Sequence, residues 1–281
     1  APIYGLGHSE EVVGKAIAGQ RDKYVISTKA TFDWDTGEGR FWHEVDGHKV
    51  YVAHGYKDII KDCENSLKRL GTDYIDIYYT HNPVRDPAWL EKYPVEDTVR
   101  ALMDLKKAGK IRCIGSSNVD PEHIEAYMAC GCEIDIIQRK YTILARGVEE
   151  NILPICEKYG MTFHAYAPIE RGLLTGTVTK DRVVPPGDAR EDQAWWAPDK
   201  LPHAIDFVDG LKDICEEYHC TQTDLAIAFI RHNRPYVNVI YGARKIKHLE
   251  AGAATVNVTL RDDTVAEIRR RAEELEAKYG G

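Results

Sequence analysis

Short apolar runs rich in β-branched and aromatic residues alternate along this chain with longer stretches whose apolar residues have helical spacing. Six runs have the pattern of strands, at 24–29, 74–81, 111–117, 134–138, 161–167 and 236–242. Five intervening segments have the pattern of helices, at 9–19, 57–71, 95–110, 121–131 and 148–160. Because neighbouring parallel strands need a crossover connection, this alternation predicts a parallel α/β fold.

Two parallel folds fit the alternation, an open dinucleotide-binding sheet and a closed barrel. The open sheet would carry GxGxxG after its first strand, but the nearest match, at residues 5–10, lacks the third glycine and has no strand before it. We therefore predict a TIM (β/α)8 barrel whose first one or two strands lie upstream of Ala1. Residues 1–281 are expected to form one N-terminally incomplete barrel domain, with a long substrate-side loop or hairpin insertion at 32–56 and extra helices near 201–219 and 222–232.

The composition narrows the class of partner. A net charge of −8 and a pI near 5.8 argue against a nucleic-acid or anionic-membrane surface, so a small-molecule partner is expected. We find no signal-peptide pattern and no apolar run of the roughly 20 residues that span a bilayer, and we expect a cytoplasmic protein. The seven cysteines are odd in number and contain no CxxC, which favours reduced thiols over a metal site.

Three polar residues stand where a barrel of this kind holds its active site. Lys29 ends the first strand-like run, His81 ends the second, and Tyr4 precedes both in YGLGHSEE. Side chains at the carboxyl ends of barrel strands point into the active-site mouth. A phenol, an ammonium and an imidazole together form a proton-donating device for a carbonyl oxygen. Taken singly, each residue has an ordinary structural explanation.

Several segments in order resemble the aldo-keto reductases: YGLGHSEEVVGKAI, VISTK, SLKRLGTDYIDIYYTH, LKKAGKIRCIGSSN, IIQRKY, AYAPIERGLLTG and VIYGARK. The resemblance implies NAD(P)H-dependent carbonyl reduction on a TIM barrel by a tetrad of Asp, Tyr, Lys and His. It assigns Tyr4 as general acid, Lys29 as the cation that lowers the pKa of the phenol, and His81 as the imidazole that orients the substrate. The family's Asp would fall before Ala1, and we expect it in an upstream segment.

The resemblance also implies the cofactor contacts. Ser117, Asn118 and Gln138 match the residues that hold the nicotinamide carboxamide, and Tyr166 matches the ring that stacks on the nicotinamide. The remaining matches are residues of the pyrophosphate loop and of the turn after the last strand: Ala167, Ile169, Arg171, Gly172, Leu173, Gly242, Ala243, Arg244 and His248.

The choice between the two dinucleotides depends on the segment after the last strand. Arg244, Lys245 and Lys247 make this corner basic, which favours NADP(H) over NAD(H), although a solvated helix face explains the charges almost as well. Ala251 and Gly252, nearby, have no side chain that can bind the adenine amino group.

The insertion and the loop after His81 are expected to select the substrate. Trp34, Trp42, His43 and Trp89 combine aromatic faces with polar groups, which suits a polyol or sugar-like carbonyl. Hydrophobic packing accounts for the tryptophans equally well, so an aromatic or aliphatic aldehyde is the competing substrate. The alternative to an enzyme is a regulatory or channel-associated subunit of the same fold that binds the nucleotide with little turnover.

Overall fold

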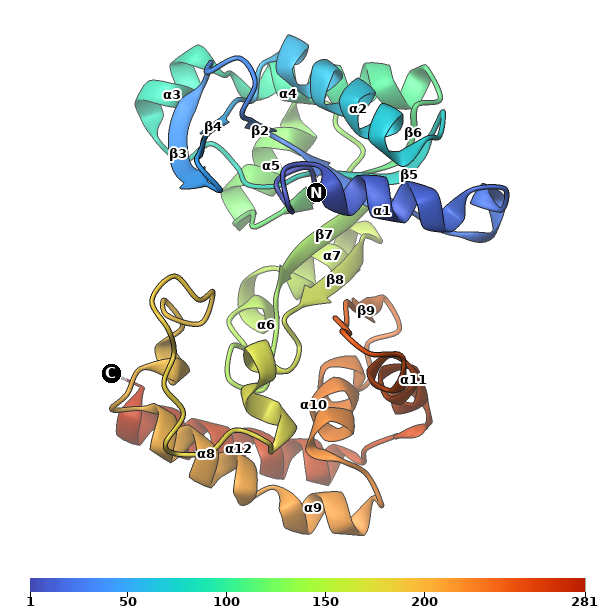
Figure 1. Ribbon diagram of the computed structural model, residues 1–281. Helices are drawn as coiled ribbons and strands as arrows, with labels where there is room; N and C mark the ends of the chain where they lie inside the picture. Colours follow the sequence, from blue (N-terminus) through green and yellow to red (C-terminus); the bar gives the residue numbers. More distant parts are fainter. Residues whose placement is uncertain (281) are drawn as a thin grey trace. The chain divides into compact units, whose positions relative to one another are not determined.

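The computed structural model describes residues 1–280, which form two compact units (Figure 1). The first contains Ala1–Gln138 and Pro154–Thr162, and the second contains Arg139–Leu153 and the chain from Phe163 onward. The prediction that residues 1–281 are one domain stays a prediction.

The first unit is built on parallel strands joined by helices. Strands β1, β5, β6 and β7 lie in that order, each parallel to the next, and β7 runs across the boundary of the unit. The elements of this unit, in chain order, are α1 (His8–Ile17), η1 (Arg21–Lys23), β1 (Ser27–Ala30), β2 (Phe32–Asp33), β3 (Arg40–Val45), β4 (His48–Val52), α2 (Tyr56–Leu70), β5 (Ile75–Thr80), α3 (Pro87–Lys92), α4 (Val95–Lys107), β6 (Ile111–Ser117), α5 (Pro121–Ala129), β7 (Ile136–Lys140) and α7 (Leu153–Tyr159).

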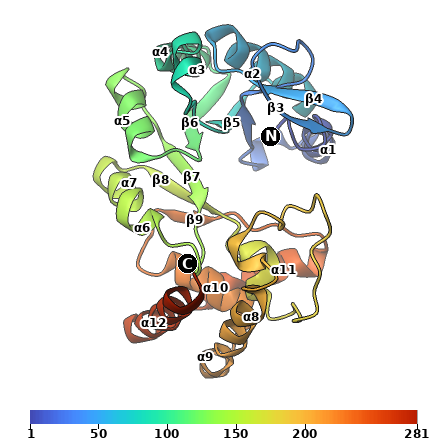
Figure 2. The same ribbon diagram turned by 90° about the vertical axis from the view of Figure 1, so that its left-hand side faces the viewer.

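Helices α2 and α4 lie side by side and cover one face of these strands (Figures 1 and 2). Helix α2 buries Ile59, Cys63 and Leu67, which are spaced by four residues along one stripe of the helix. It ends at Gly71, whose φ of 64° is the left-handed conformation that glycine adopts without strain. The predicted helix at 57–71 is thus confirmed with bounds shifted by one residue, and the helix predicted at 95–110 is confirmed but ends three residues earlier.

The ring of Tyr79 on β5 lies so close to β6 that the facing residue, Gly115, can only be glycine. A Cβ on Gly115 would lie 2.3 Å from the ring of Tyr79, the residue that it pairs with on β5. Tyr79 is fully buried, and the missing side chain lets its ring lie across the neighbouring strand.

Residues 32–56 contain the predicted hairpin. Strands β2, β4 and β3 form a separate antiparallel sheet in that order. The tight turn between β3 and β4 contains Asp46 and Gly47, with φ of 49° and 79°. Positive φ at both central residues is what a type I′ hairpin turn requires.

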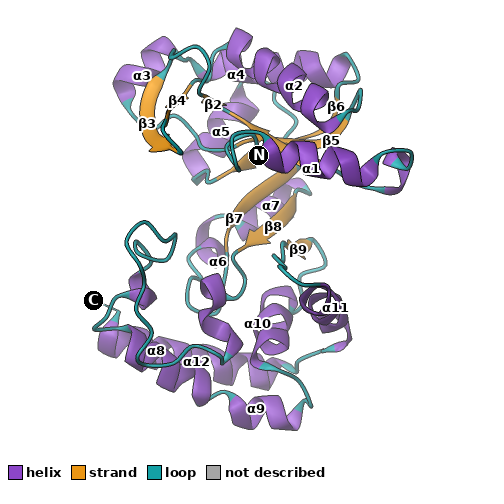
Figure 3. Cartoon of the chain, viewed as in Figure 1, coloured by secondary structure: helices purple, strands orange, loops and turns teal. Residues whose placement is uncertain are grey.

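In the second unit β8 pairs in parallel with β9, and α8 packs against the long α12. The loop of residues 176–193 joins η2 to η3 (Figure 3). The elements are α6 (Val148–Asn151), β8 (Thr162–Tyr166), η2 (Glu170–Thr175), η3 (Ala194–Trp196), α8 (Leu201–Asp209), α9 (Lys212–Glu217), α10 (Gln222–Arg231), β9 (Val237–Val239), α11 (Ile246–Ala254), η4 (Thr255–Asn257) and α12 (Asp262–Tyr279).

All six predicted strands are present, and the ends of five of them shift by one to three residues. The predicted single helix at 148–160 is wrong, because the segment forms two helices, α6 and α7, that are separated at Ile152. Pro154 lies in the first turn of α7 and has no N–H to donate. In a continuous helix its ring would collide with the carbonyl four residues earlier, so the helix cannot run through this position. The helix predicted near 201–219 also divides, at Gly210 and Leu211.

The buried carboxylate of Glu10 connects α1 to both α2 and β1. Glu10 is 3% exposed, and its Oε2 accepts a hydrogen bond from Arg69 Nε at 2.6 Å. Its Oε1 accepts from the Thr28 hydroxyl at 2.5 Å, and Thr28 precedes Lys29 on β1. This contact fixes the segment around Tyr4 relative to the strand that carries Lys29.

We expect Glu10→Ala to lower the free energy of unfolding by about 1–3 kcal/mol, because it leaves the largely buried Arg69 guanidinium and the Thr28 hydroxyl without their partner. Urea denaturation measures the change. Glu11→Ala is the matched control, since Glu11 lies on the same turn but its side chain is half-exposed, and it should change stability by less than about 0.5 kcal/mol. Equal effects of the two substitutions would refute the anchoring role of Glu10.

Candidate functional site

The first unit brings Tyr4, Lys29 and His81 together. Lys29 Nζ donates a hydrogen bond of 3.5 Å to Tyr4 Oη, and the rings of Tyr4 and His81 meet edge to face with centroids 5.9 Å apart. Tyr4 is 50% exposed. The three groups that the sequence places in different segments therefore form one cluster.

Burial shifts the pKa of both basic members of the cluster. It lowers the pKa of Lys29 to about 8. It also lowers the pKa of His81 to about 3, with a further contribution from the charge of Lys29. At neutral pH Lys29 is therefore a cation beside the Tyr4 phenol, whereas His81 is a neutral imidazole that can donate a hydrogen bond but has no acidic proton to give.

His81 Nδ1 is buried and has no hydrogen-bond partner within the described residues 1–280. The position of its backbone is fixed by Asn118, whose Nδ2 donates to the His81 carbonyl at 2.9 Å and to Asn82 Oδ1 at 3.0 Å. Asn118 has a φ of 60°, a conformation that asparagine tolerates better than most residues.

Of the three residues predicted to hold the carboxamide, Ser117 and Gln138 are buried and pair with each other across β6 and β7. The Gln138 side chain is hydrogen-bonded to the Tyr79 hydroxyl. The Asn118 amide is engaged with the loop after β5. All three lie in the first unit, near the carboxyl ends of neighbouring parallel strands, and their cofactor role stays a prediction.

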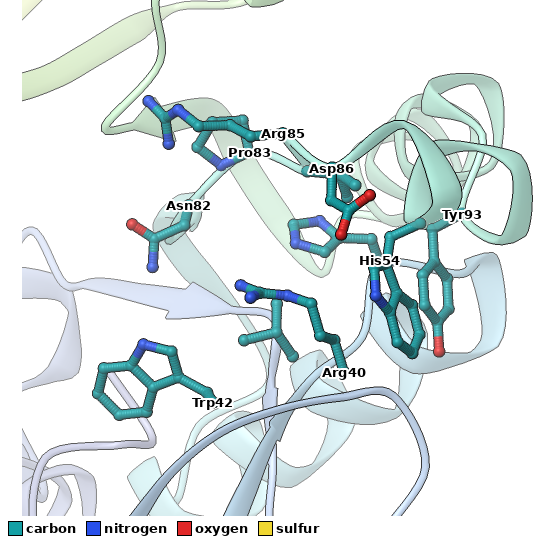
Figure 4. Close-up of a pocket in the computed structure, with 11 residues that line it drawn as sticks. Arg40, Trp42, His54, Asn82, Pro83, Arg85, Asp86 and Tyr93 are labelled. Atoms are coloured by element: carbon teal, nitrogen blue, oxygen red, sulfur yellow. The ribbon is translucent and has the colours of Figure 1, made fainter.

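Beside the cluster lies a pocket of about 390 Å³ in the first unit (Figure 4). Trp42 and Trp89, both predicted to bind substrate, line it. Two further lining residues, Arg40 and His54, were missed by the sequence analysis. Alternation in the sequence could not have found them, because a β-bulge between Phe41 and His43 interrupts the period of two on β3 at the point where Trp42 joins Arg40 in the pocket.

The other two predicted substrate residues lie elsewhere in the first unit. Trp34 packs against a hydrophobic cluster of Ile3, Phe32, Val50 and Val52. His43 is exposed and meets the Trp42 ring at 5.8 Å without lining the pocket. Their role in substrate binding stays a prediction.

In the second unit the loop after β8 has an unusual backbone. Ala167, Glu170, Arg171 and Gly172 all have positive φ, between 49° and 102°. The Glu170 side chain is 1% exposed and forms an ion pair with Lys140, while its Oε2 accepts from Thr142 Oγ1 at 2.8 Å. Buried polar contacts of this kind compensate for the cost of the left-handed conformation.

This loop and the segment after β9 line a pocket of about 1190 Å³ within the second unit. Six of the residues predicted to bind the cofactor line it: Ile169, Arg171, Gly172, Gly242, Arg244 and His248. Leu173 is buried instead, while Ala167 and Ala243 are outside the lining.

The pocket has excess positive charge. Arg171, Arg244 and Lys245 line it, and none of the three has a side-chain hydrogen bond or ion pair among the described residues. Its Arg190, by contrast, is neutralised by Asp188 at 2.7 Å. Lys245 is the N-cap of α11, whose first backbone N–H groups favour an anion. The size and charge of this pocket fit the phosphates of a dinucleotide.

Gly252, on α11, has a packing role. A Cβ there would lie 2.4 Å from the ring of Tyr241, which lines the same pocket. Tyr166 ends β8 in the second unit, where burial raises the pKa of its hydroxyl.

No helix within residues 1–280 is long and apolar enough to cross a membrane. In the same residues, no three His, Cys, Asp or Glu side chains lie close enough to hold a metal ion. All seven cysteines have free thiols.

Comparison with known proteins gives the same family over nearly the whole chain. Residues 1–273 match the model of the aldo/keto reductase family. The chain is 38% identical to the NADH-specific methylglyoxal reductase of Escherichia coli (strain K12), over 98% of this chain and 83% of the relative.

Solved structures agree with this assignment. A glycerol dehydrogenase from Gluconobacter oxydans superimposes with a TM-score of 0.84 at 27% identity, over 99% of this chain and 80% of that one. An aldo/keto reductase from Klebsiella pneumoniae in complex with NADP and acetate gives a TM-score of 0.67 at 28% identity, over 99% and 78%. The predicted α/β barrel class is confirmed, and the chain belongs to the aldo/keto reductase family of NAD(P)-dependent oxidoreductases.

Proposed function

We propose that this protein interconverts a small hydrophilic carbonyl compound and its alcohol, with Tyr4 as general acid in reduction and general base in oxidation. The observation that carries the proposal is the contact of 3.5 Å between Lys29 Nζ and Tyr4 Oη, beside the His81 ring. The bound nicotinamide cofactor would supply or accept the hydride.

The three side chains have different tasks in this mechanism. The Tyr4 hydroxyl donates a hydrogen bond to the carbonyl oxygen and then its proton, as negative charge develops there. Lys29 stabilises the phenolate that remains, because an ammonium beside a phenol favours the ionised form. His81, neutral at pH 7, donates a second hydrogen bond and orients the carbonyl, but a pKa of about 3 excludes it as the acid.

For the cofactor we propose Ser117, Asn118 and Gln138 as contacts of the nicotinamide carboxamide and Tyr166 as the ring that stacks on the nicotinamide. The basic pocket within the second unit is the proposed site of the phosphates. The Escherichia coli relative is named as NADH-specific, whereas the Klebsiella pneumoniae structure contains NADP, so the preference depends on this chain's own residues. Unpaired Arg244 and Lys245 favour NADP(H).

For the substrate we propose a small polar or sugar-like carbonyl compound. Arg40, Asn82 and Asp86 give the pocket beside the cluster a polar lining, and Trp42 and Trp89 add aromatic faces. The names of the relatives, a methylglyoxal reductase and a glycerol dehydrogenase, refer to small hydrophilic molecules and are consistent with this class.

Loss of nicotinamide absorbance on mixing the protein with NADPH or NADH and a panel of aldehydes and sugars tests the proposed activity directly. We expect small polar carbonyl compounds to be reduced. Binding of the cofactor without oxidation by any carbonyl compound would instead favour a nucleotide-binding subunit with little turnover.

Replacement of the acid tests the mechanism. Tyr4→Phe should lower kcat about 10²–10⁴-fold, the usual contribution of general acid catalysis, while cofactor affinity is retained. Tyr24→Phe, at an exposed tyrosine outside the cluster, is the control. Unchanged turnover by the Tyr4 variant would exclude Tyr4 as the acid.

The depressed pKa of Lys29 predicts a pH profile. The kcat/KM for reduction should fall as the pH rises through about 8, because the ammonium that stabilises the Tyr4 phenolate loses its proton. Lys29→Arg keeps a charged group at this position over the same range and should lack the decline near pH 8. An alkaline limb that is identical in the two proteins would show that Lys29 is not the titrating group.

The same shift has a consequence for stability. The folded pKa of about 8 lies below the ordinary 10.5, so between these values the unfolded chain binds more protons and stability rises with pH. We therefore expect the free energy of unfolding of the native protein, relative to that of Lys29→Met, to rise from pH 8 to 10.5. Urea denaturation of both proteins at each pH measures the difference.

Arg244→Gln tests the cofactor preference. Loss of a charged partner for a phosphate should raise the Kd of NADPH about 10–100-fold and that of NADH much less. Titration of nicotinamide fluorescence measures both constants. Lys212→Gln, on α9 and outside the pocket, is the control for net charge. Equal losses for the two cofactors would contradict a 2′-phosphate contact at Arg244.

A further inference from the structure

The pocket beside the catalytic cluster has a direct route to it. Asn82 lines the pocket and is the residue after His81, and the Asn118 amide holds the two together. On the other side, the Trp42 ring meets Phe32 at 4.8 Å, and Phe32 meets His81 at 5.0 Å. A group bound in this pocket is therefore within the length of a small molecule from the carbonyl site.

One side of the pocket is formed by the buried His54, whose ring has an unpaired nitrogen. His54 is 2% exposed, and its Nε2 has no hydrogen-bond partner within residues 1–280. Its backbone is fixed, because Thr98 Oγ1 donates to the His54 carbonyl at 2.7 Å. Burial, with a contribution from Arg40, lowers the pKa of its imidazole to about 3, so the ring is neutral. A buried polar atom without a partner is costly unless a ligand supplies one.

The second feature is a guanidinium without a counter-ion. Arg40 begins β3 opposite Val52, and Figure 4 shows its guanidinium directed into the pocket. It forms no side-chain hydrogen bond or ion pair within the described part of the chain. It is also close enough to His54 to affect the titration of that ring.

The other two charged residues that line the pocket, Arg85 and Asp86, already have hydrogen-bond partners. Arg85 Nη2 donates to Asp120 Oδ2 at 2.8 Å and to the Asn118 carbonyl at 2.6 Å. Asp86 caps α3, accepting a hydrogen bond from the backbone of Ala88 at 2.9 Å. Arg40 is thus the charged side chain that can still bind a ligand. With two arginines and one aspartate in the lining, the pocket has one more cation than anions.

We propose that this pocket binds an anionic oxygen group, a carboxylate or a phosphate, on the carbonyl substrate, with Arg40 as its charged partner and His54 Nε2 as a hydrogen-bond donor. The planar fork of an arginine matches two oxygens of such a group, and the Trp42 ring forms an aromatic side of the pocket. The inference rests on the proposed carbonyl reduction and makes its substrate an oxo acid or a phosphorylated aldehyde.

Matched pairs of substrates test the charge. Succinic semialdehyde is compared with butanal, and glyceraldehyde 3-phosphate with glyceraldehyde, by the oxidation of NADPH and NADH. We expect the anionic member of at least one pair to have the higher kcat/KM, and the pair that shows the preference identifies the group as carboxylate or phosphate.

Arg40→Gln should lower the ratio of kcat/KM for the anionic over the neutral member about 10–100-fold, as expected for loss of a charge-assisted hydrogen bond. Arg40→Lys should restore part of the ratio. Lys49→Gln removes a charge from the exposed β3–β4 hairpin without touching the pocket and serves as the matched control. Equal kcat/KM within both pairs, or a ratio unchanged by Arg40→Gln, would overturn the anion site while leaving carbonyl reduction intact.

A binding measurement separates failure of this inference from failure of the proposed function. Quenching of Trp42 fluorescence is titrated with succinate and with inorganic phosphate, in the absence of cofactor, and Trp42→Phe identifies the signal of this residue. Saturable quenching that Arg40→Gln abolishes would support the site even if none of the aldehydes oxidises NADPH or NADH. Absence of quenching by both anions would count against it.

Discussion

The contact that the candidate active site depends on most is the buried carboxylate of Glu10 between Arg69 and Thr28. Tyr4 lies in a turn rather than a regular element, so nothing in its own secondary structure fixes it relative to β1. Glu10 supplies that constraint, because α1 follows the turn directly and Thr28 is the neighbour of Lys29. An ion pair of this kind adds little net stability compared with apolar packing, but breaking one partner is costly, and the geometry is therefore strongly specified.

Burial and charge act together at the site. The interior lowers the pKa of Lys29 to a value at which the ammonium still exists at neutral pH, and it lowers that of His81 far enough that the ring is neutral. One environment thus gives two basic residues different protonation states. Under the proposed function this difference assigns the proton to Tyr4 and leaves His81 as a hydrogen-bond donor.

Much of this arrangement could be predicted from the sequence, for a physical reason. Parallel strands bring their carboxyl ends to one edge, so the residues after apolar runs, such as His81 and Ser117, meet whatever the exact bounds of the strands. The roles of Arg40 and His54 could not be found in this way, since both depend on the register in which β3 folds back on β4. The same register explains why Trp42 reaches the pocket and Trp34, on the first arm of the insertion, packs instead into the cluster around Phe32. The interruption at Ile152, two residues before Pro154, shows a further limit, because helical spacing of apolar residues continues across a proline that prevents helical hydrogen bonding.

The hairpin of residues 32–56 is a sheet of its own, hydrogen-bonded as β2–β4–β3 and not as part of the parallel strands. Its tip can therefore accept substitutions and changes of length without disturbing the strands that hold Lys29 and His81. Under the proposed function, the residues assigned to the chemistry and those assigned to substrate binding belong to separate sheets: Lys29 lies on the parallel strands, whereas Arg40 and Trp42 lie on the hairpin. Diversification of substrate range within such a scaffold would then proceed through the hairpin, at little cost to folding.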